Sequence, residues 1–183
     1  MPHRYWSLLG RQPVSRHRIF DVYHDRYRVA PSNIERDFVV IDASDWINVV
    51  PITADGDVVM IRQYRHGVRQ VTLEIPGGMI DAGEDPAAAA RRELREETGY
   101  EAAEVRLLGR TFPNPAIQSN TLHCFVAENV TQVGVPHPDE FERIEVVTVP
   151  LSDIPRLARD GSIGHALVIV ALGLMGALTE QPR

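Results

Sequence analysis

The sequence lacks the cysteines and the leader segment that are typical of disulfide-bonded and secreted proteins. It contains one cysteine, Cys124, among 183 residues, which excludes an intrachain disulfide and a metal site built from cysteines. A lone thiol of this kind is typical of a buried apolar filler. The stretch from Met1 to Arg11 lacks the apolar core of a secretory signal. We therefore expect a protein of the reducing cytoplasm.

Long apolar runs and basic surfaces are also missing. The most apolar stretch, 163–178, is interrupted by His165 and glycines and is shorter than the ~20 residues needed to span a bilayer, so we expect a core helix and no membrane partner. All 19 basic residues are arginine, which fits either phosphate binding or, as we favour, a composition bias. The formal net charge of -6 argues against nucleic acid as a partner.

The length suits one domain with a small appendage. Residues 1–45 are arginine-rich, with alternating runs at 18–23 and 38–41 around the turn-prone 30–33, and they predict a small antiparallel sheet. Residues 46–183 would form the main domain. It opens with a hairpin, because the runs 46–52 and 58–63 flank an Asp55-Gly56 turn. Further strands are expected at 71–75, 105–109, 122–127 and 144–149, and helices at 154–159 and 163–178.

One further helix has clear start and stop signals. Asp85 can cap its N-terminus, Pro86 suits the first helical position, and Gly99 suits the left-handed conformation that ends many helices. The sequence therefore predicts a helix from about Pro86 to Thr98. The order of strands, helix, strands and helices predicts an α/β protein with a mixed sheet packed between helices.

This helix carries Glu93, Glu96 and Glu97 on one face, because they are three and four residues apart. Left alone, such carboxylates repel one another by a few tenths of a kcal/mol per pair. A divalent cation removes that conflict, and carboxylate-only ligation suits Mg²⁺ or Mn²⁺. The alternative is a solvated acidic face whose partners are neighbouring arginines.

The surrounding residues favour the metal-binding interpretation, because they satisfy a long pattern. The segment reads Gly78, five residues, Glu84, seven residues, Arg92-Glu93-Leu94, one residue, Glu96-Glu97, one residue, Gly99-Tyr100. It resembles the complete signature box of the Nudix hydrolases, at residues 78–100. The resemblance implies an α/β/α sandwich that holds a nucleoside diphosphate derivative through metal ions. It also implies roles for five residues: Glu93, Glu97 and the Gly77 carbonyl as metal ligands, Glu96 assisting, and Arg92 orienting the carboxylates.

Outside the box, the chain resembles the branch that includes ADP-ribose and other nucleoside diphosphate sugar pyrophosphatases. The similar segments are 62–65, 73–79 and Pro115. The resemblance implies a homodimer paired through the N-terminal sheet, and these substrate-binding residues: Arg65, Met79, the loop Asn114-Pro115-Ala116, and Arg36 across the dimer interface. The alternatives are an ion-pair partner for Arg65, a core residue for Met79 and a simple turn for Pro115.

Two positions depart from that branch. The loop at 114–116 replaces a serine-proline-glycine pattern, and Asn120 stands where a sugar-contacting acid is common, so the expected substrate is ADP-ribose or another nucleoside diphosphate sugar. The acidic segment 139–142 matches a mobile loop that carries the general base. By that likeness Glu140 is the base and Glu142 an added metal ligand, unless the segment is merely a solvated turn.

The expected activity is Mg²⁺-dependent hydrolysis of a diphosphate to a nucleoside monophosphate and a sugar phosphate. Metal ions would neutralise the diphosphate and lower the pKa of water, while a carboxylate removes its proton. The alternative is a non-catalytic sensor that binds ADP-ribose or a related nucleotide. Such sensors usually lose box carboxylates, whereas this chain keeps all four. Processing of long RNA is discouraged by the acidic balance.

Overall fold

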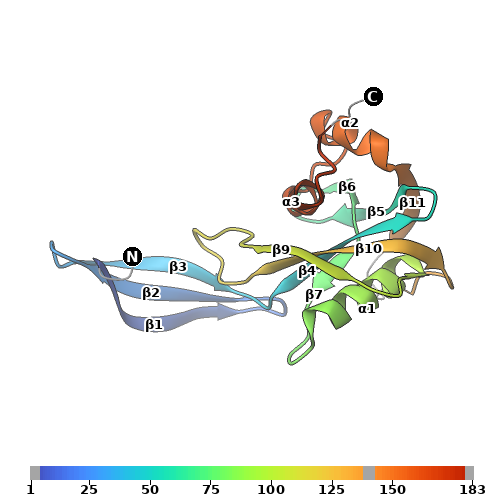
Figure 1. Cartoon of the computed structure of the whole chain (residues 1–183). Coiled ribbons are helices and arrows are strands. Elements are labelled where there is room, and N and C mark those ends of the chain that lie inside the picture. The colour runs from blue at the N-terminus through green and yellow to red at the C-terminus, as the bar shows by residue number, and fades with distance from the viewer. Residues whose placement is uncertain (1–4, 138–142, 180–183) are drawn as a thin grey trace. The chain divides into compact units, whose positions relative to one another are not determined.

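The computed structural model describes residues 5–137 and 143–179. The chain divides into two compact units, the first made of residues 1–45 and 112–121 and the second of residues 46–111 and 122–183. Strands and helices are both present (Figure 1). The predicted α/β class is therefore confirmed.

The first unit contains a small antiparallel sheet, as the alternating runs predicted, and it has three strands. Its strands are β1 (Trp6–Arg16), β2 (Asp21–Val29) and β3 (Ile34–Asp42), in that order. The predicted turn joins β2 to β3, with Asn33 at φ 54°. β1 was not predicted, because it is exposed along almost its whole length and contains Gly10 and Pro13. Both residues lie at irregularities in its pairing with β2, where glycine and proline are tolerated in strands.

Aromatic and ionic contacts hold this first unit together. Trp6, Tyr27 and Phe38 meet edge to face, with ring centroids 5.8–6.3 Å apart. Arg11 donates two hydrogen bonds, of 2.7 and 2.9 Å, to the buried carboxylate of Asp25. The loop 112–121 joins β3 through backbone hydrogen bonds between Ile41 and residues 117 and 119. The aliphatic clusters of the protein lie elsewhere, in the second unit.

The second unit is built on a mixed sheet, which runs β11-β5-β4-β10-β8. β6 pairs with β5, β7 with β4, and β9 with β10; the β4–β10 pair is parallel and the others are antiparallel. The predicted Asp-Gly hairpin joins β4 to β5, with Gly56 at φ 84°. The strands are β4 (Trp46–Thr53), β5 (Asp57–Arg65), β6 (Gln70–Glu74), β7 (Gly77–Met79), β8 (Tyr100–Glu101), β9 (Arg106–Thr111), β10 (Leu122–Gln132) and β11 (Ile144–Pro150).

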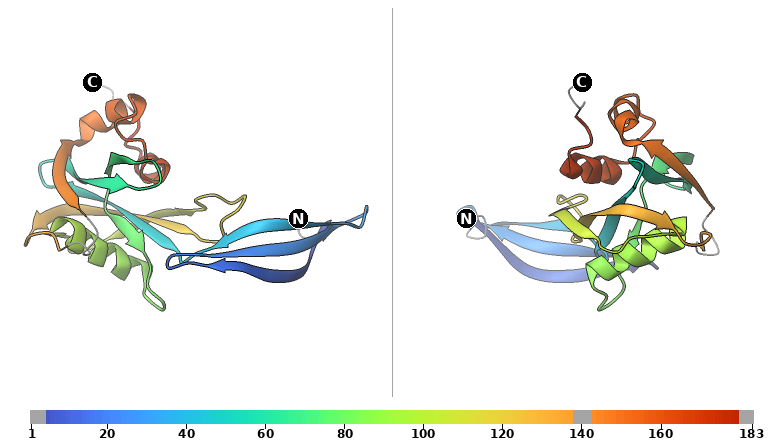
Figure 2. Two further views of the ribbon diagram at one scale, coloured as in Figure 1. Left: turned by 180° about the vertical axis from the view of Figure 1, so that it is seen from behind. Right: turned by 45° about the vertical axis from the view of Figure 1, so that its right-hand side comes forward.

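Helices cover both faces of this sheet, so the predicted sandwich is observed (Figures 1 and 2). α1 (Pro86–Thr98) packs into one apolar cluster, and α3 (Ala166–Met175) packs into the other beside α2 (Ile154–Arg159) and the 3₁₀ turn Leu151–Asp153. α3 is shorter than the predicted 163–178, because His165 caps its start and Gly176, at φ 82°, ends it. Among the described residues, no helix has the length and apolar character that a membrane crossing requires.

The chain passes from the edge of β5 to the edge of β4 just before the predicted site, and this short segment is called the crossing. Glu74, the last residue of β6, pairs with Ile61 of β5, whereas Gly77, the first residue of β7, pairs with Asn48 of β4. The chain therefore moves from one strand to the other within three residues. Along this crossing the Pro76 carbonyl accepts a hydrogen bond of 3.0 Å from the Val49 amide.

Candidate active site

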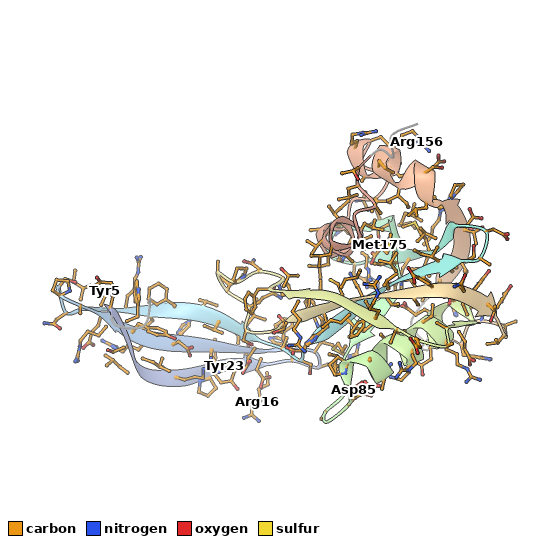
Figure 3. The ribbon with its side chains drawn as sticks, in the orientation of Figure 1. Tyr5, Arg16, Tyr23, Asp85, Arg156 and Met175 are labelled. Carbon is orange, nitrogen blue, oxygen red and sulfur yellow. The ribbon has the colours of Figure 1, made fainter. Side chains whose placement is uncertain are left out.

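Local interactions determine where α1 begins and ends. The Asp85 side chain accepts hydrogen bonds of 3.0 and 3.1 Å from the amides of Ala87 and Ala88, and Figure 3 shows Asp85 at the start of the helix. At the other end Gly99, at φ 73°, donates a hydrogen bond to the Arg95 carbonyl. Both predicted caps and both predicted bounds are confirmed. Because Leu94 is fully buried, the rotation of the helix is fixed, and with it the direction of its glutamates.

Two of the glutamates lie against the glycines of β7. Glu97 is 3% exposed, and its Oε2 accepts a hydrogen bond of 2.9 Å from the Gly77 amide. Glu93 lies against Gly78, where an added Cβ would be 2.5 Å from the Glu93 Cδ. Gly77 is equally close to β4, because a Cβ there would be 2.5 Å from the Ile47 carbonyl oxygen. These glycines thus allow the carboxylates and the backbone to approach each other.

Arg92 connects the remaining acidic groups. Its Nε and Nη2 donate to Glu84 at 2.9 and 3.0 Å, and its Nη1 donates to Glu93 at 2.8 Å and to Glu96 at 3.2 Å. Nη2 also donates to the Met79 carbonyl at 3.1 Å. The hydrogen bonds from Arg92 lower the pKa of Glu84 and keep it ionised. One guanidinium therefore fixes three carboxylates and the end of β7.

The donor set fits a hard divalent cation. Within residues 5–137 and 143–179, no three acidic, histidine or cysteine side chains converge closely enough to hold a metal by themselves. Mg²⁺, however, commonly binds one or two protein carboxylates and completes its octahedron with water and substrate phosphates. Glu93, Glu97 and the Gly77 carbonyl offer oxygens of that type. The predicted Glu140 and Glu142 lie outside the described residues.

Arg65, at the end of β5, is an ion-pair partner in this structure. Its Nε and Nη2 donate to the two oxygens of Glu74 at 2.8 and 2.7 Å. The Glu74 side chain is 3% exposed, whereas that of Arg65 is 40% exposed. Sequence reasoning missed Glu74. The available signal was an acidic residue between two apolar ones, Leu73 and Ile75, inside a predicted strand.

Several predicted substrate residues belong to the first unit: Arg36, Asn114, Pro115, Ala116 and Asn120. Arg36 is exposed on β3, and the Asn114 carbonyl accepts hydrogen bonds from the amides of residues 117 and 118, which closes a turn around Pro115 and Ala116. Asn120 is 1% exposed, and the Oδ1 and Nδ2 atoms of its side chain have no hydrogen-bond partner within the described part of the chain. Met79, in the second unit, is 39% exposed.

Comparisons with known proteins agree with this fold. The NUDIX domain family matches residues 46–169, so this chain belongs to the Nudix family. It is 31% identical to the ADP compounds hydrolase NudE of Escherichia coli over 92% of this chain and 90% of that protein. It is 26% identical to the ADP-ribose pyrophosphatase of Bacillus subtilis over 91% and 90% of the two chains.

A solved structure shows the same fold. The crystal structure of an ADP compounds hydrolase superposes with a TM-score of 0.82 at 26% identity, covering 94% of this chain and 92% of that one. These matches confirm the predicted branch, which resembles the ADP-ribose pyrophosphatases. The protein is accordingly a hydrolase that cleaves a pyrophosphate bond.

Proposed function

We propose that this enzyme uses Mg²⁺ to hydrolyse ADP-ribose or another nucleoside diphosphate sugar to a nucleoside monophosphate and a sugar phosphate. The observation that carries the proposal is the packing of Glu93 and Glu97 against Gly78 and Gly77. This packing directs oxygen ligands towards one short segment of backbone. The named activities of the relatives support a nucleotide-linked substrate. Mn²⁺ is the alternative metal.

Different residues of the chain would bind the metal ions and activate the attacking water. When bound, the metal ions neutralise the diphosphate and lower the pKa of water. Glu93, Glu97 and the Gly77 carbonyl hold them, with Glu96 and Arg92 orienting the carboxylates and Glu142 as an added ligand. Glu140 would take a proton from the attacking water, whose oxygen bonds to one phosphorus as the P–O–P bond breaks, so that a nucleoside monophosphate and a sugar phosphate are released.

The remaining predicted residues would hold the substrate. Arg65 contributes positive charge to the diphosphate, because a guanidinium binds phosphate oxygens in a planar, bidentate manner. Met79, the loop Asn114-Pro115-Ala116 and Asn120 contact the nucleotide or the sugar. Arg36 reaches the substrate from the other protomer of a homodimer.

The test is release of nucleoside monophosphate from a panel of nucleoside diphosphate sugars with Mg²⁺ or Mn²⁺. Glu97→Gln should lower the rate by at least about a hundredfold, because a ligand of the cation is lost. Glu101→Gln is the matched control, since Glu101 forms an exposed ion pair with Arg95 at the end of the same helix. If the wild type turns over no substrate faster than Glu97→Gln, hydrolysis of this class is wrong. Binding of ADP-ribose without turnover would then favour the sensor.

We also propose that two cytoplasmic chains pair through the first unit. Its sheet exposes Leu8, Ile34 and Val39, which are 54%, 64% and 48% accessible, and pairing with a second chain would bury such apolar area. Light scattering after gel filtration should give the mass of two chains for the wild type and of one chain for Leu8→Glu/Val39→Glu. A wild-type monomer at micromolar concentration would contradict the pairing.

A further inference from the structure

Glu74 is a buried carboxylate with an unusually full set of contacts. Besides the two hydrogen bonds from Arg65, it accepts one of 2.5 Å from the Thr72 hydroxyl. Burial by itself raises the pKa of Glu74, but the hydrogen bonds from Arg65 and Thr72 outweigh it, so the pKa is lowered. The carboxylate is therefore ionised at neutral pH, although it lies away from solvent.

A third element reaches the same carboxylate. The Nδ1 of His165 accepts a hydrogen bond of 3.2 Å from the Leu167 amide and so caps α3. The other ring nitrogen, Nε2, is 4.0 Å from the Glu74 Oε2. Glu74 is thus the point where β5, β6 and the start of α3 meet.

The position of Glu74 along the chain links it to the candidate site. It is the last residue of β6, three residues before Gly77, whose amide donates to Glu97. The crossing from β5 to β4 is consequently held at one end by Arg65 and at the other by a proposed metal ligand. A shift at one end would move the other.

A gain in folding stability alone does not explain the ion pair between Glu74 and Arg65. Replacing a buried ion pair by apolar residues is often neutral or stabilising. Here only Glu74 is buried, and its partner exposes 40% of its side chain. The arrangement holds a long, flexible cation in one orientation at the surface, beside the strand that enters the site. An oriented guanidinium loses less entropy when it binds phosphate oxygens.

We propose that Glu74 is a positioning residue for hydrolysis, which holds the Arg65 guanidinium towards the diphosphate of the substrate and acts through Arg65. This inference rests on the function proposed above. It predicts an effect on substrate binding rather than on the chemical step, because Glu74 lies beneath Arg65 and is shielded from solvent.

A double-mutant cycle tests the inference, with Glu74→Gln, Arg65→Ala and the double variant. Glu74→Gln should raise KM about five- to tenfold and leave kcat within about threefold, since only orientation is lost. In the Arg65→Ala background the same change should not raise KM further. Metal-free binding of ADP, measured by calorimetry, should weaken by the same factor as KM rises. Glu145→Gln is the control, because it breaks an exposed ion pair between Glu145 and Arg62, which lies on β5 like Arg65.

Three results would overturn the proposal. Unchanged KM and ADP affinity with a lower melting temperature would leave Glu74 a purely structural role. Additive effects of the two substitutions would show that Glu74 does not act through Arg65. If Glu74→Gln fails to fold, Thr72→Val takes its place, because it removes the hydrogen bond from Thr72 to Glu74 and should raise KM about two- to threefold. An unchanged KM in Thr72→Val would also overturn the proposal. A wild type without turnover instead refutes the proposed function, while ADP binding still tests the cycle.

Discussion

Adding one methyl group at Gly78 tests where the Glu93 carboxylate lies. The new Cβ would be 2.5 Å from the Glu93 Cδ, whereas carbons in contact stay about 3.5–4.0 Å apart. The carboxylate must therefore move by about 1 Å or more. A displacement of that size in a positioned group costs roughly a hundredfold in rate, or about 2.7 kcal/mol of transition-state stabilisation. Because the displaced group ends a flexible side chain, the free energy of unfolding should change by only about 1 kcal/mol.

The neighbouring glycine should behave differently. At Gly77 an added Cβ would be 2.5 Å from the Ile47 carbonyl oxygen, a backbone atom that cannot rotate away. β7 and β4 would have to separate, so Gly77→Ala should lower the free energy of unfolding by about 1–3 kcal/mol. Gly67→Ala serves as the control, because no described atom lies within 4 Å of a Cβ at that position.

The assay is nucleoside monophosphate release over a range of Mg²⁺ concentrations, combined with thermal unfolding. Gly78→Ala should lose about a hundredfold in activity while its melting temperature stays within about 2–4 °C of the wild type. Wild-type activity in Gly78→Ala would show that the Glu93 carboxylate is not held against β7 during the reaction. A collapse of stability at Gly78, as large as at Gly77, would refute the argument from side-chain flexibility.

Four other outcomes follow from the structure. Asp85→Ala should cost about 1 kcal/mol in chemical denaturation, because the cap of α1 is lost; no change would show that the cap is redundant. Arg92→Lys keeps the charge but not the planar fork, and activity should fall about 10- to 100-fold, with a wild-type rate as the contrary result. Folding lowers the pKa of Glu74, so its contribution to stability is present above the ordinary glutamate pKa of about 4.3 and is lost as the pH falls through the folded value. The free energy of urea unfolding should therefore depend less on pH, between pH 7 and pH 3, in Glu74→Gln than in the wild type. Burial raises the pKa of Cys124 to about 11, so a thiol reagent at pH 8 should label it in urea but not in the native protein.

The sequence alone predicted α1 and its bounds closely. Its caps at Asp85 and Gly99 act through hydrogen bonds to residues at most four positions away, so they can be identified from nearby residues. The spacing of Glu93 and Glu97 likewise predicts a shared face, because helical geometry is regular. The structure adds that Glu93 and Glu97 lie against Gly78 and Gly77.

Other features depend on partners distant in the chain. β1 became a strand through its pairing with β2, without an apolar pattern of its own. The loop 112–121 joined the first unit through hydrogen bonds to β3, about 75 positions earlier in the chain. No local rule at these residues predicts such pairings, since a strand's register depends on which neighbours are available.

The sequence by itself therefore determined the family, the helix that carries the acidic residues and the face that those residues share, because a signature pattern, periodicity and capping are local. Only the tertiary structure decided that Arg65 is oriented by Glu74, and that this pair lies three residues from Gly77. The first relation arises from the pairing of β5 with β6 and the second from the crossing to β4, and both depend on which strands pair.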